Sequence, residues 1–171
     1  MLRILGIDPG SRVTGYAVIT ASADPSPRLT YVECGVVEAD VDDPLEKRLG
    51  EVAHGIREIV AELRPDVVAM EDLFYGKNVR SMIALAQARG AAMVAVAHAG
   101  LAVTAYPPAK VKLAVTGRGR AGKDQVSLMV RGLLGLKRAP RLDATDALAI
   151  AVTHALHRRL DHALLLRRAA S

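Results

Sequence analysis

Three successive segments at the start of the chain have the residue pattern of β-strands, and turn residues separate them. Residues 2–7 form an apolar run that ends at Asp8, and a Pro-Gly-Ser turn then leads into the β-prone residues 14–20. Residues 29–37 alternate between apolar and polar side chains after a Pro- and Ser-rich turn. Short strands joined by tight turns are typical of antiparallel hairpins. We therefore expect the fold to open with three hairpin-connected strands, the first of which ends at Asp8.

The rest of the chain alternates between helical and strand patterns. Residues 44–63 place apolar side chains on one side of a helix, and the apolar run 66–70 is a strand that leads directly to Glu71. A helix over 78–97 connects this strand to a short strand at 101–106, and a crossover helix implies a parallel strand pair. Further helices are expected over residues 109–115, 123–136 and 142–159, with a basic glycine-rich loop at 116–122. The pattern predicts an α/β fold with a mixed five-stranded sheet flanked by helices.

Length and composition are those of one folded domain. A chain of 171 residues can bury a full core, and 51% hydrophobic with 24% charged residues favours folding over disorder. No uncharged run reaches the about 18 residues of a membrane helix, and Asp8 interrupts the N-terminal apolar run before a signal core forms. The single Cys34 cannot form an internal disulfide. We expect a single domain over residues 1–171, with a basic tail that frays after about residue 160, in a reducing cytoplasm and outside any membrane.

The charge balance is basic. Lys and Arg outnumber Asp and Glu by 23 to 18, and the pI is near 9.7. Such a chain attracts polyanions through phosphate contacts. Because net charge bears on association rather than on fold, it leaves the partner open, and the chemistry of a site must decide it.

Four acidic residues stand where expected elements begin or end. Asp8 and Glu71 each follow a strand, and Asp143 and Asp146, three positions apart, share one face at the start of the last helix. If the two strands are neighbours and the helix packs over their ends, the carboxylate oxygens converge on hard divalent cations, as in two-metal phosphodiester hydrolysis. The ordinary alternatives are an acidic helix N-terminus for the Asp-x-x-Asp pair and a turn aspartate for Asp8.

Four groups of motifs occur along the chain in order: Gly6-Ile7-Asp8-Pro9-Gly10-Ser11 with Thr14-Gly15; Glu71-Asp72-Leu73-Phe74 leading to Lys77-Asn78; Gln87-Ala88-Arg89-Gly90; and Asp143-Ala144-Thr145-Asp146-Ala147-Leu148-Ala149. In this order and at this spacing they resemble the RuvC family of bacterial Holliday junction resolvases. The resemblance covers the chain from residue 2 to about residue 158.

The resemblance implies a ribonuclease H-like fold and a metal-dependent endodeoxyribonuclease. Such an enzyme resolves four-way DNA junctions in recombination and repair by paired hydrolytic nicks that leave 5′-phosphate and 3′-hydroxyl ends. It implies Asp8, Glu71, Asp143 and Asp146 as catalytic residues that bind two Mg²⁺ ions, with Mn²⁺ able to substitute. Some family members have His where this chain has Asp143, which leaves the duty of Asp143 open. It also implies the RuvA-RuvB branch-migration complex as a partner. One domain offers one acidic cluster whereas resolution requires two incisions, so we expect a symmetric homodimer, with the Ala- and Met-rich helix at 78–97 as the contact.

One aromatic segment is a candidate for contact with DNA bases. Phe74, the single Phe, lies in a segment with Tyr75, Lys77 and Arg80. An exposed aromatic beside cations can stack on an unpaired base, whereas a Phe folded into the core is the ordinary alternative. The resemblance favours the base contact, because the matching aromatic of the family contacts bases at the junction centre.

Basic residues near the glycine-rich loop are candidates for phosphate contacts. Lys112 and Lys123 bracket this loop and match functionally important lysines of the family, and Arg118 and Arg120 lie between them. Solvated surface charge is the ordinary alternative for each. We rank the two lysines above the two arginines.

Other functions share parts of this pattern. A sugar kinase or actin-like ATPase has a similar first turn, but it needs two such domains and a second Asp-x-Gly, which this chain lacks. A junction-binding module without catalysis would not need clustered acids. Ribonuclease H acting on RNA–DNA hybrids and the YqgF-like RNA-processing proteins are the closer alternatives, because the fold alone does not exclude them.

Overall fold

A five-stranded sheet in the order β3-β2-β1-β4-β5 forms the centre of the protein. The computed structural model describes the chain except for residues 25, 74–77 and 170–171, and except for side chains after Arg158. The strands are β1 (Leu2–Asp8), β2 (Val13–Ala21), β3 (Leu29–Glu38), β4 (Val67–Glu71) and β5 (Val103–Tyr106). The β1–β2 and β2–β3 pairs are antiparallel, and the β1–β4 and β4–β5 pairs are parallel. The predicted mixed sheet of the α/β class is confirmed.

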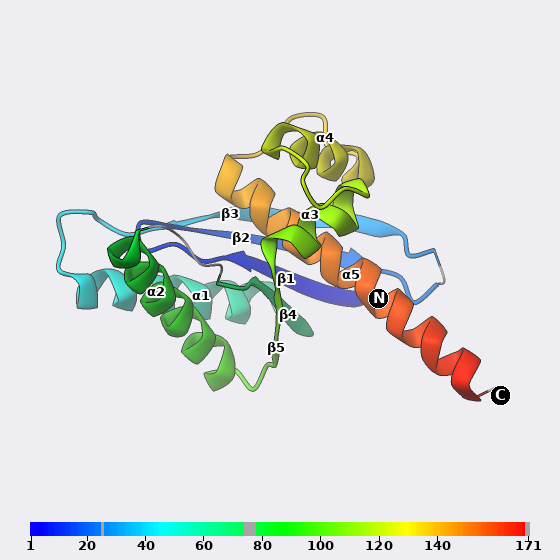
Figure 1. Ribbon diagram of the computed structural model, residues 1–171. Helices are drawn as coiled ribbons and strands as arrows, with labels where there is room; N and C mark the ends of the chain where they lie inside the picture. Colours follow the sequence, from blue (N-terminus) through cyan, green and yellow to red (C-terminus); the bar gives the residue numbers. More distant parts are fainter. Residues whose placement is uncertain (25, 74–77, 170–171) are drawn as a thin grey trace.

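Helices cover both faces of the sheet (Figure 1). The helices are α1 (Leu45–Leu63), α2 (Val79–His98), α3 (Pro108–Thr116), α4 (Lys123–Leu134) and α5 (Leu142–Ala169). The first two share one hydrophobic core with one face of the sheet, and the last three share a second core with the other face. Successive residues of β1 point to opposite faces, so Ile4 joins the α5 side and Leu5 the α1 side. A strand buried on both faces explains why residues 4–7, the buried part of β1, contain no polar side chain.

The last helix is longer than its sequence pattern predicted. We expected it to end at Arg159, whereas α5 continues to Ala169 and projects beyond the sheet (Figure 1). Residues 160–169 are rich in Leu, Ala and Arg and contain neither Gly nor Pro, so no helix-ending residue occurs there. The fraying expected for this tail stays a prediction.

Helix α2 is the one helix in the described part of the chain that is long and apolar enough, by length and composition, to cross a membrane. It also carries Arg80 and Arg89, which the hydrocarbon interior of a bilayer disfavours. Its Ala92 and Val96 are fully buried in the core shared with α1. Because a core helix of a globular domain meets the same criterion, composition alone is weak grounds for a membrane span.

Candidate active site

Two neighbouring parallel strands each end at an acidic residue. Asp8 is the last residue of β1, and Glu71 is the last residue of β4. The register pairs Ile7 with Met70, so Asp8 and Glu71 follow at the same edge of the sheet. The two side chains are close enough that each affects the pKa of the other. The two strands whose ends the sequence pattern assigned to these acids are thus sheet neighbours, which brings the two carboxylates to one place.

The start of α5 lies directly on β1 and β2, and two glycines permit this approach. A Cβ atom at Gly6 would collide with the carbonyl oxygen of Ala147, and one at Gly15 would collide with that of Asp143. Both collisions are with helix backbone, which cannot move aside as a flexible side chain can, so only glycine allows the helix to lie so close. This packing brings the first turns of α5, with Asp146, over the ends of the strands.

Asp8, Glu71 and Asp146 line one cleft of about 270 Å³. The other residues that line it are Pro108, Val111, Lys112, Lys123, Val126, Ala149 and Ile150. Asp143 is not among these residues, although its charge is close enough to act on Asp8. The structure thus brings three of the four predicted acids into the cleft and leaves Asp143 beside it.

The acidic side chains of the cleft are strongly coupled. Burial, followed by the charges of Glu71, Asp146 and Asp143, raises the pKa of Asp8 from 3.8 to about 8. Burial and the charge of Asp146 also raise the pKa of Glu71. Negative charges held together away from water are costly unless cations accompany them. The negative potential of the cleft therefore favours the binding of a cation.

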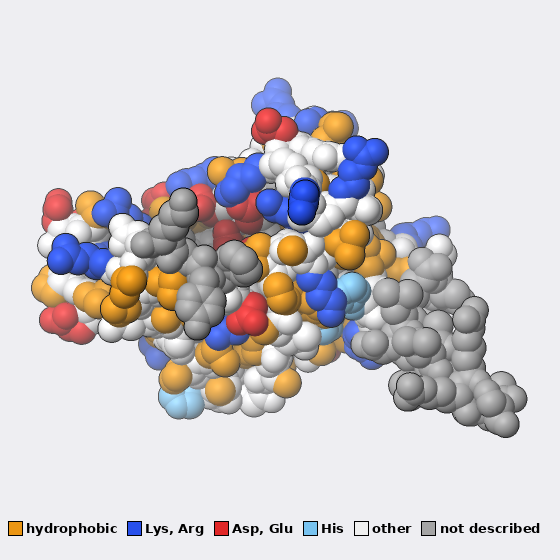
Figure 2. Space-filling view, viewed as in Figure 1, with side chains coloured by type: hydrophobic (Ala, Val, Ile, Leu, Met, Phe, Trp, Pro, Cys, Tyr) orange, Lys and Arg blue, Asp and Glu red, His pale blue; other side chains and the backbone are white. Residues whose placement is uncertain are grey.

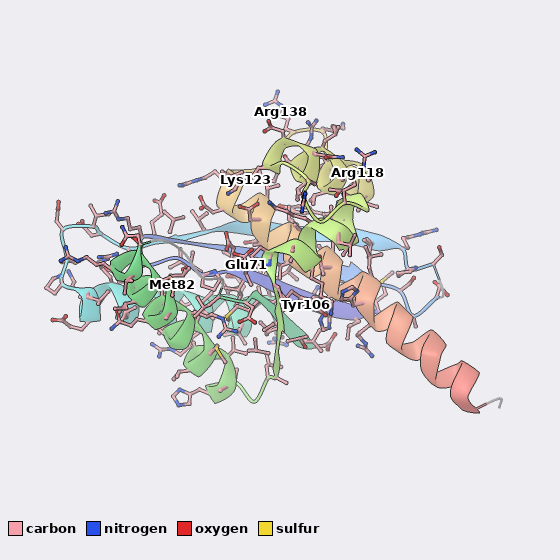
Figure 3. The ribbon with its side chains drawn as sticks, in the orientation of Figure 1. Glu71, Met82, Tyr106, Arg118, Lys123 and Arg138 are labelled. Atoms are coloured by element: carbon pink, nitrogen blue, oxygen red, sulfur yellow. The ribbon has the colours of Figure 1, made fainter. Side chains whose placement is uncertain are left out.

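Two lysines supply part of that positive charge. Lys123 at the start of α4 places its Nζ 3.1 Å from Oδ2 of Asp146, and Lys112 of α3 lines the same cleft. Partial burial lowers the pKa of Lys123, but the hydrogen bond to Asp146 and the nearby carboxylates outweigh it and raise that pKa overall. Figure 3 shows Lys123 and Glu71 on the same side of the molecule, the first on α4 and the second at the end of β4.

The donor set of the cleft fits a hard divalent cation, because carboxylate oxygens are the ligands that Mg²⁺ and Mn²⁺ prefer. Among the described residues, however, no three His, Cys, Asp or Glu side chains already stand at the spacing of a finished metal site. Carboxylates repel one another, and a cation between them would draw Asp8, Glu71 and Asp146 inward.

Hydrogen bonds hold the turn that follows Asp8. The buried Thr14 hydroxyl donates to the Gly10 carbonyl oxygen at 2.9 Å, and the same hydroxyl oxygen accepts from the Gly10 backbone N–H. Arg48 of α1 donates from Nε to the Ser11 carbonyl oxygen at 3.0 Å. No local sequence pattern pointed to Arg48, because it lies 37 residues from Ser11 along the chain.

The predicted DNA-contact residues fall into two groups. Phe74, Tyr75 and Lys77 lie outside the described residues. The others are Arg80, exposed on the first turn of α2, the exposed loop residues Arg118 and Arg120, and the cleft residues Lys112 and Lys123. Figure 2 shows acidic side chains at the middle of this face, with Lys and Arg side chains above them on the α3–α4 part.

The family model described as crossover junction endodeoxyribonuclease RuvC matches residues 4–154. The chain belongs to the RuvC family. RuvC of Halorhodospira halophila is 48% identical over 158 residues, with 92% of each chain covered. RuvC of Trichlorobacter lovleyi is 46% identical over 153 residues, which cover 90% of this chain and 84% of that protein.

A solved RuvC structure has the same fold. Thermus thermophilus RuvC, determined in complex with a Holliday junction substrate, superposes with a TM-score of 0.87 at 37% identity, over 94% of this chain and 97% of that one. The expected ribonuclease H-like fold and RuvC membership are thereby confirmed. The family consists of metal-dependent nucleases, and the acidic cleft is the part of this chain whose side chains suit a metal ion.

Proposed function

We propose that this RuvC-family protein resolves four-way DNA junctions by paired hydrolytic nicks, in recombination and repair. The observation that carries the proposal is the cleft in which Asp8, Glu71 and Asp146 meet Lys112 and Lys123. The acids can bind the metal ions that assist attack on a phosphodiester, and the lysines can bind the phosphate group. In-line attack by water with departure of the 3′ oxygen leaves 5′-phosphate and 3′-hydroxyl ends that a ligase can seal.

Asp8, Glu71 and Asp146 are the proposed metal-binding catalytic residues, and Asp143 is the proposed fourth. Two Mg²⁺ ions per site, for which Mn²⁺ can substitute, would activate the attacking water and stabilise the leaving oxygen. Burial of Asp8 among three other carboxylates supports this assignment, because such a group stays ionised at neutral pH only beside added positive charge. Asp143 lies outside the cleft lining, but its charge acts on Asp8 and on Lys123, which supports it as the fourth acid of the set.

The proposed DNA contacts divide by role. Lys112 and Lys123 hold the phosphate that is cut, since both line the cleft with the acids. Arg118 and Arg120 contact phosphates further along a DNA strand. Arg80, on the first turn of α2, contacts another DNA phosphate. Phe74 stacks on an unpaired base at the junction centre, with Tyr75 and Lys77 next to it.

We further propose a homodimer in the cytoplasm that cooperates with a RuvA-RuvB branch-migration complex. One domain offers one acidic cleft, whereas resolution requires two incisions, and a two-fold dimer matches the two-fold symmetry of an opened junction. Helix α2 is the proposed contact. Its Val79, Ile83 and Val94 are 66%, 55% and 55% exposed, which is unusual for large apolar side chains unless another chain covers them.

Cleavage of matched substrates tests the function. We would incubate the protein with a labelled four-way junction, a plain duplex of the same sequence and an RNA–DNA hybrid, each with Mg²⁺ or with chelator. We expect Mg²⁺-dependent, symmetric cutting of the junction and little cutting of the other two. Preferential cutting of the hybrid would instead indicate a ribonuclease H, and junction binding without any cutting would indicate a binding module.

A further inference from the structure

Arg89 of α2 contacts the chain at the point where β4 ends. Its Nε donates a hydrogen bond to the carbonyl oxygen of Glu71 at 3.1 Å. One Nη lies 3.4 Å from Oδ1 of Asp72, and the other lies 3.2 Å from Sδ of Met93. The Arg89 side chain is only 16% exposed. All three guanidinium nitrogens are therefore engaged by protein groups.

The Glu71 carbonyl lies just past the end of a strand ladder. The β1–β4 register ends at Ile7 and Met70, one residue before Glu71. On the other side, the backbone N–H of Asp72 still donates to the Tyr106 carbonyl oxygen at 2.9 Å. Main-chain carbonyls away from water need a hydrogen-bond donor. Arg89 donates this hydrogen bond to the Glu71 carbonyl, because the pairing with β1 has already ended. The backbone of β4 is therefore held in place as far as Glu71.

We propose that Arg89 is a positioning residue for the metal site. It fixes the backbone of Glu71 and thereby the direction in which the Glu71 carboxylate enters the cleft. Arg89 itself does not line the cleft, so it acts through Glu71 rather than on the DNA. This inference rests on the proposed function, because Glu71 as a metal ligand is part of that proposal.

The guanidinium group suits this task better than an ammonium group. Arginine presents donors in a rigid planar fork, which here reaches a main-chain oxygen and a carboxylate at once. A lysine at this position could meet one of the two partners but would not hold both in fixed geometry. Arg89→Lys should therefore keep the charge near Asp72 while loosening Glu71.

Arg3 offers a matched control. It is also a partly buried arginine that donates to a main-chain carbonyl, from Nη1 to Leu63 at 2.9 Å. Arg3 belongs to β1, but it lies near the start of that strand, at the end of the sheet opposite Asp8. Arg3→Gln thus removes a similar bond and leaves the cleft untouched.

The test is the binding of Mn²⁺ alone to metal-stripped protein, measured by calorimetry. For Arg89→Gln we expect about tenfold weaker binding, the usual loss when support behind a metal ligand is removed, and for Arg89→Lys about threefold. Arg3→Gln should bind Mn²⁺ like the wild type. Junction affinity in chelator should stay the same in all three variants, since Arg89 does not touch DNA in this assignment.

The outcomes separate the two proposals. If Glu71→Gln leaves Mn²⁺ binding unchanged, the proposed ligand set is wrong. If Glu71→Gln weakens binding but both Arg89 variants bind normally, the ligand set stands and the positioning role is overturned. Equal weakening in Arg3→Gln would also overturn it, because the effect would then follow general stability. If Arg89→Gln does not fold, the Mn²⁺ affinity of Arg89→Lys decides between the same outcomes.

Discussion

Nζ of Lys123 lies 3.1 Å from Oδ2 of Asp146, so a cation from α4 reaches an acid of α5 at the cleft. The same lysine lowers the pKa of both Asp8 and Glu71, although burial and the neighbouring carboxylates prevail. Lys123 therefore offsets part of the negative charge of the site. Its side chain is 63% exposed, which leaves it free to turn toward a phosphate.

Removal of either cleft lysine should weaken the interaction with DNA. We expect Lys112→Ala and Lys123→Ala each to bind a junction several-fold less tightly and to flatten the dependence of log K on log salt by about one unit, because each removes about one phosphate contact. Lys47→Ala is the control, since Lys47 of α1 pairs with Asp43, which precedes that helix, and does not line the cleft. Salt titrations measured by fluorescence anisotropy check this. An unchanged slope in both cleft variants would argue against phosphate contact.

The stability of the metal-free protein should fall as pH rises. The pKa of Asp8 is about 8 in the folded protein against an ordinary 3.8, so the folded state holds a proton that the unfolded state has lost between these values. The free energy of unfolding in chelator should decline by about 5 kcal/mol from about pH 4 to pH 8, since each unit of pKa difference is worth about 1.4 kcal/mol. Asp8→Asn should remove most of this decline and melt at least about 10 °C higher at pH 8.

Thermal melts of wild type and Asp8→Asn in chelator, at pH 5 and pH 8, measure the effect. Added Mg²⁺ should restore the wild type at pH 8 and leave Asp8→Asn nearly unchanged. A wild type that becomes more stable from pH 5 to pH 8 in chelator would contradict the coupling of these acids.

The sheet and the strand-end acids could be predicted because their signals are local. Apolar runs that end at Asp8 and Glu71 mark strands, and parallel strands bring their carboxyl ends to one edge. The contacts of Arg48 with Ser11 and of Arg89 with Glu71 could not be predicted in this way. They join residues 37 and 18 positions apart, and only the packing of α1 and α2 on the sheet determines them.

The position of Asp143 also could not be predicted from the sequence pattern. A spacing of three residues predicts one helix face for Asp143 and Asp146, but it also separates them by about 4.5 Å along the axis and about 60° around it. In α5 that offset is enough to leave Asp146 in the cleft and Asp143 outside its lining. The spacing therefore predicts the helix and its face, but not which of the two acids lines the cleft.

Phe74→Ala should impair incision more than binding. Stacking on an opened base positions the strand, whereas general affinity comes from Lys and Arg. We expect junction affinity within about threefold of the wild type and a cleavage rate at least about tenfold lower, since one lost stack is worth about 1–3 kcal/mol. Single-turnover cleavage and gel shifts measure both. A variant that unfolds, with its folded fraction fully active, would place Phe74 in the core.

An acidic substitution on α2 should disrupt the dimer. Ile83→Glu or Val94→Glu puts a charge into the proposed apolar contact and should weaken self-association at least about a hundredfold, because a buried unpaired charge costs several kcal/mol. Sedimentation should report a dimer for the wild type. The wild type should also linearise a circular cruciform substrate within one binding event. A wild type that sediments as a monomer and makes only uncoupled single nicks would count against paired incision.

The most direct test of the central claim compares junction cutting and junction binding in Asp8→Asn, Glu71→Gln and Asp146→Asn. Each variant keeps the shape of the side chain and removes its charge, so cutting with Mg²⁺ should fall at least about a thousandfold, as expected when a metal-assisted step is lost. Binding should remain measurable in a gel shift, since phosphate contacts supply affinity separately. Near-normal, Mg²⁺-dependent cutting by Asp8→Asn would contradict the assignment of this cleft as the active site.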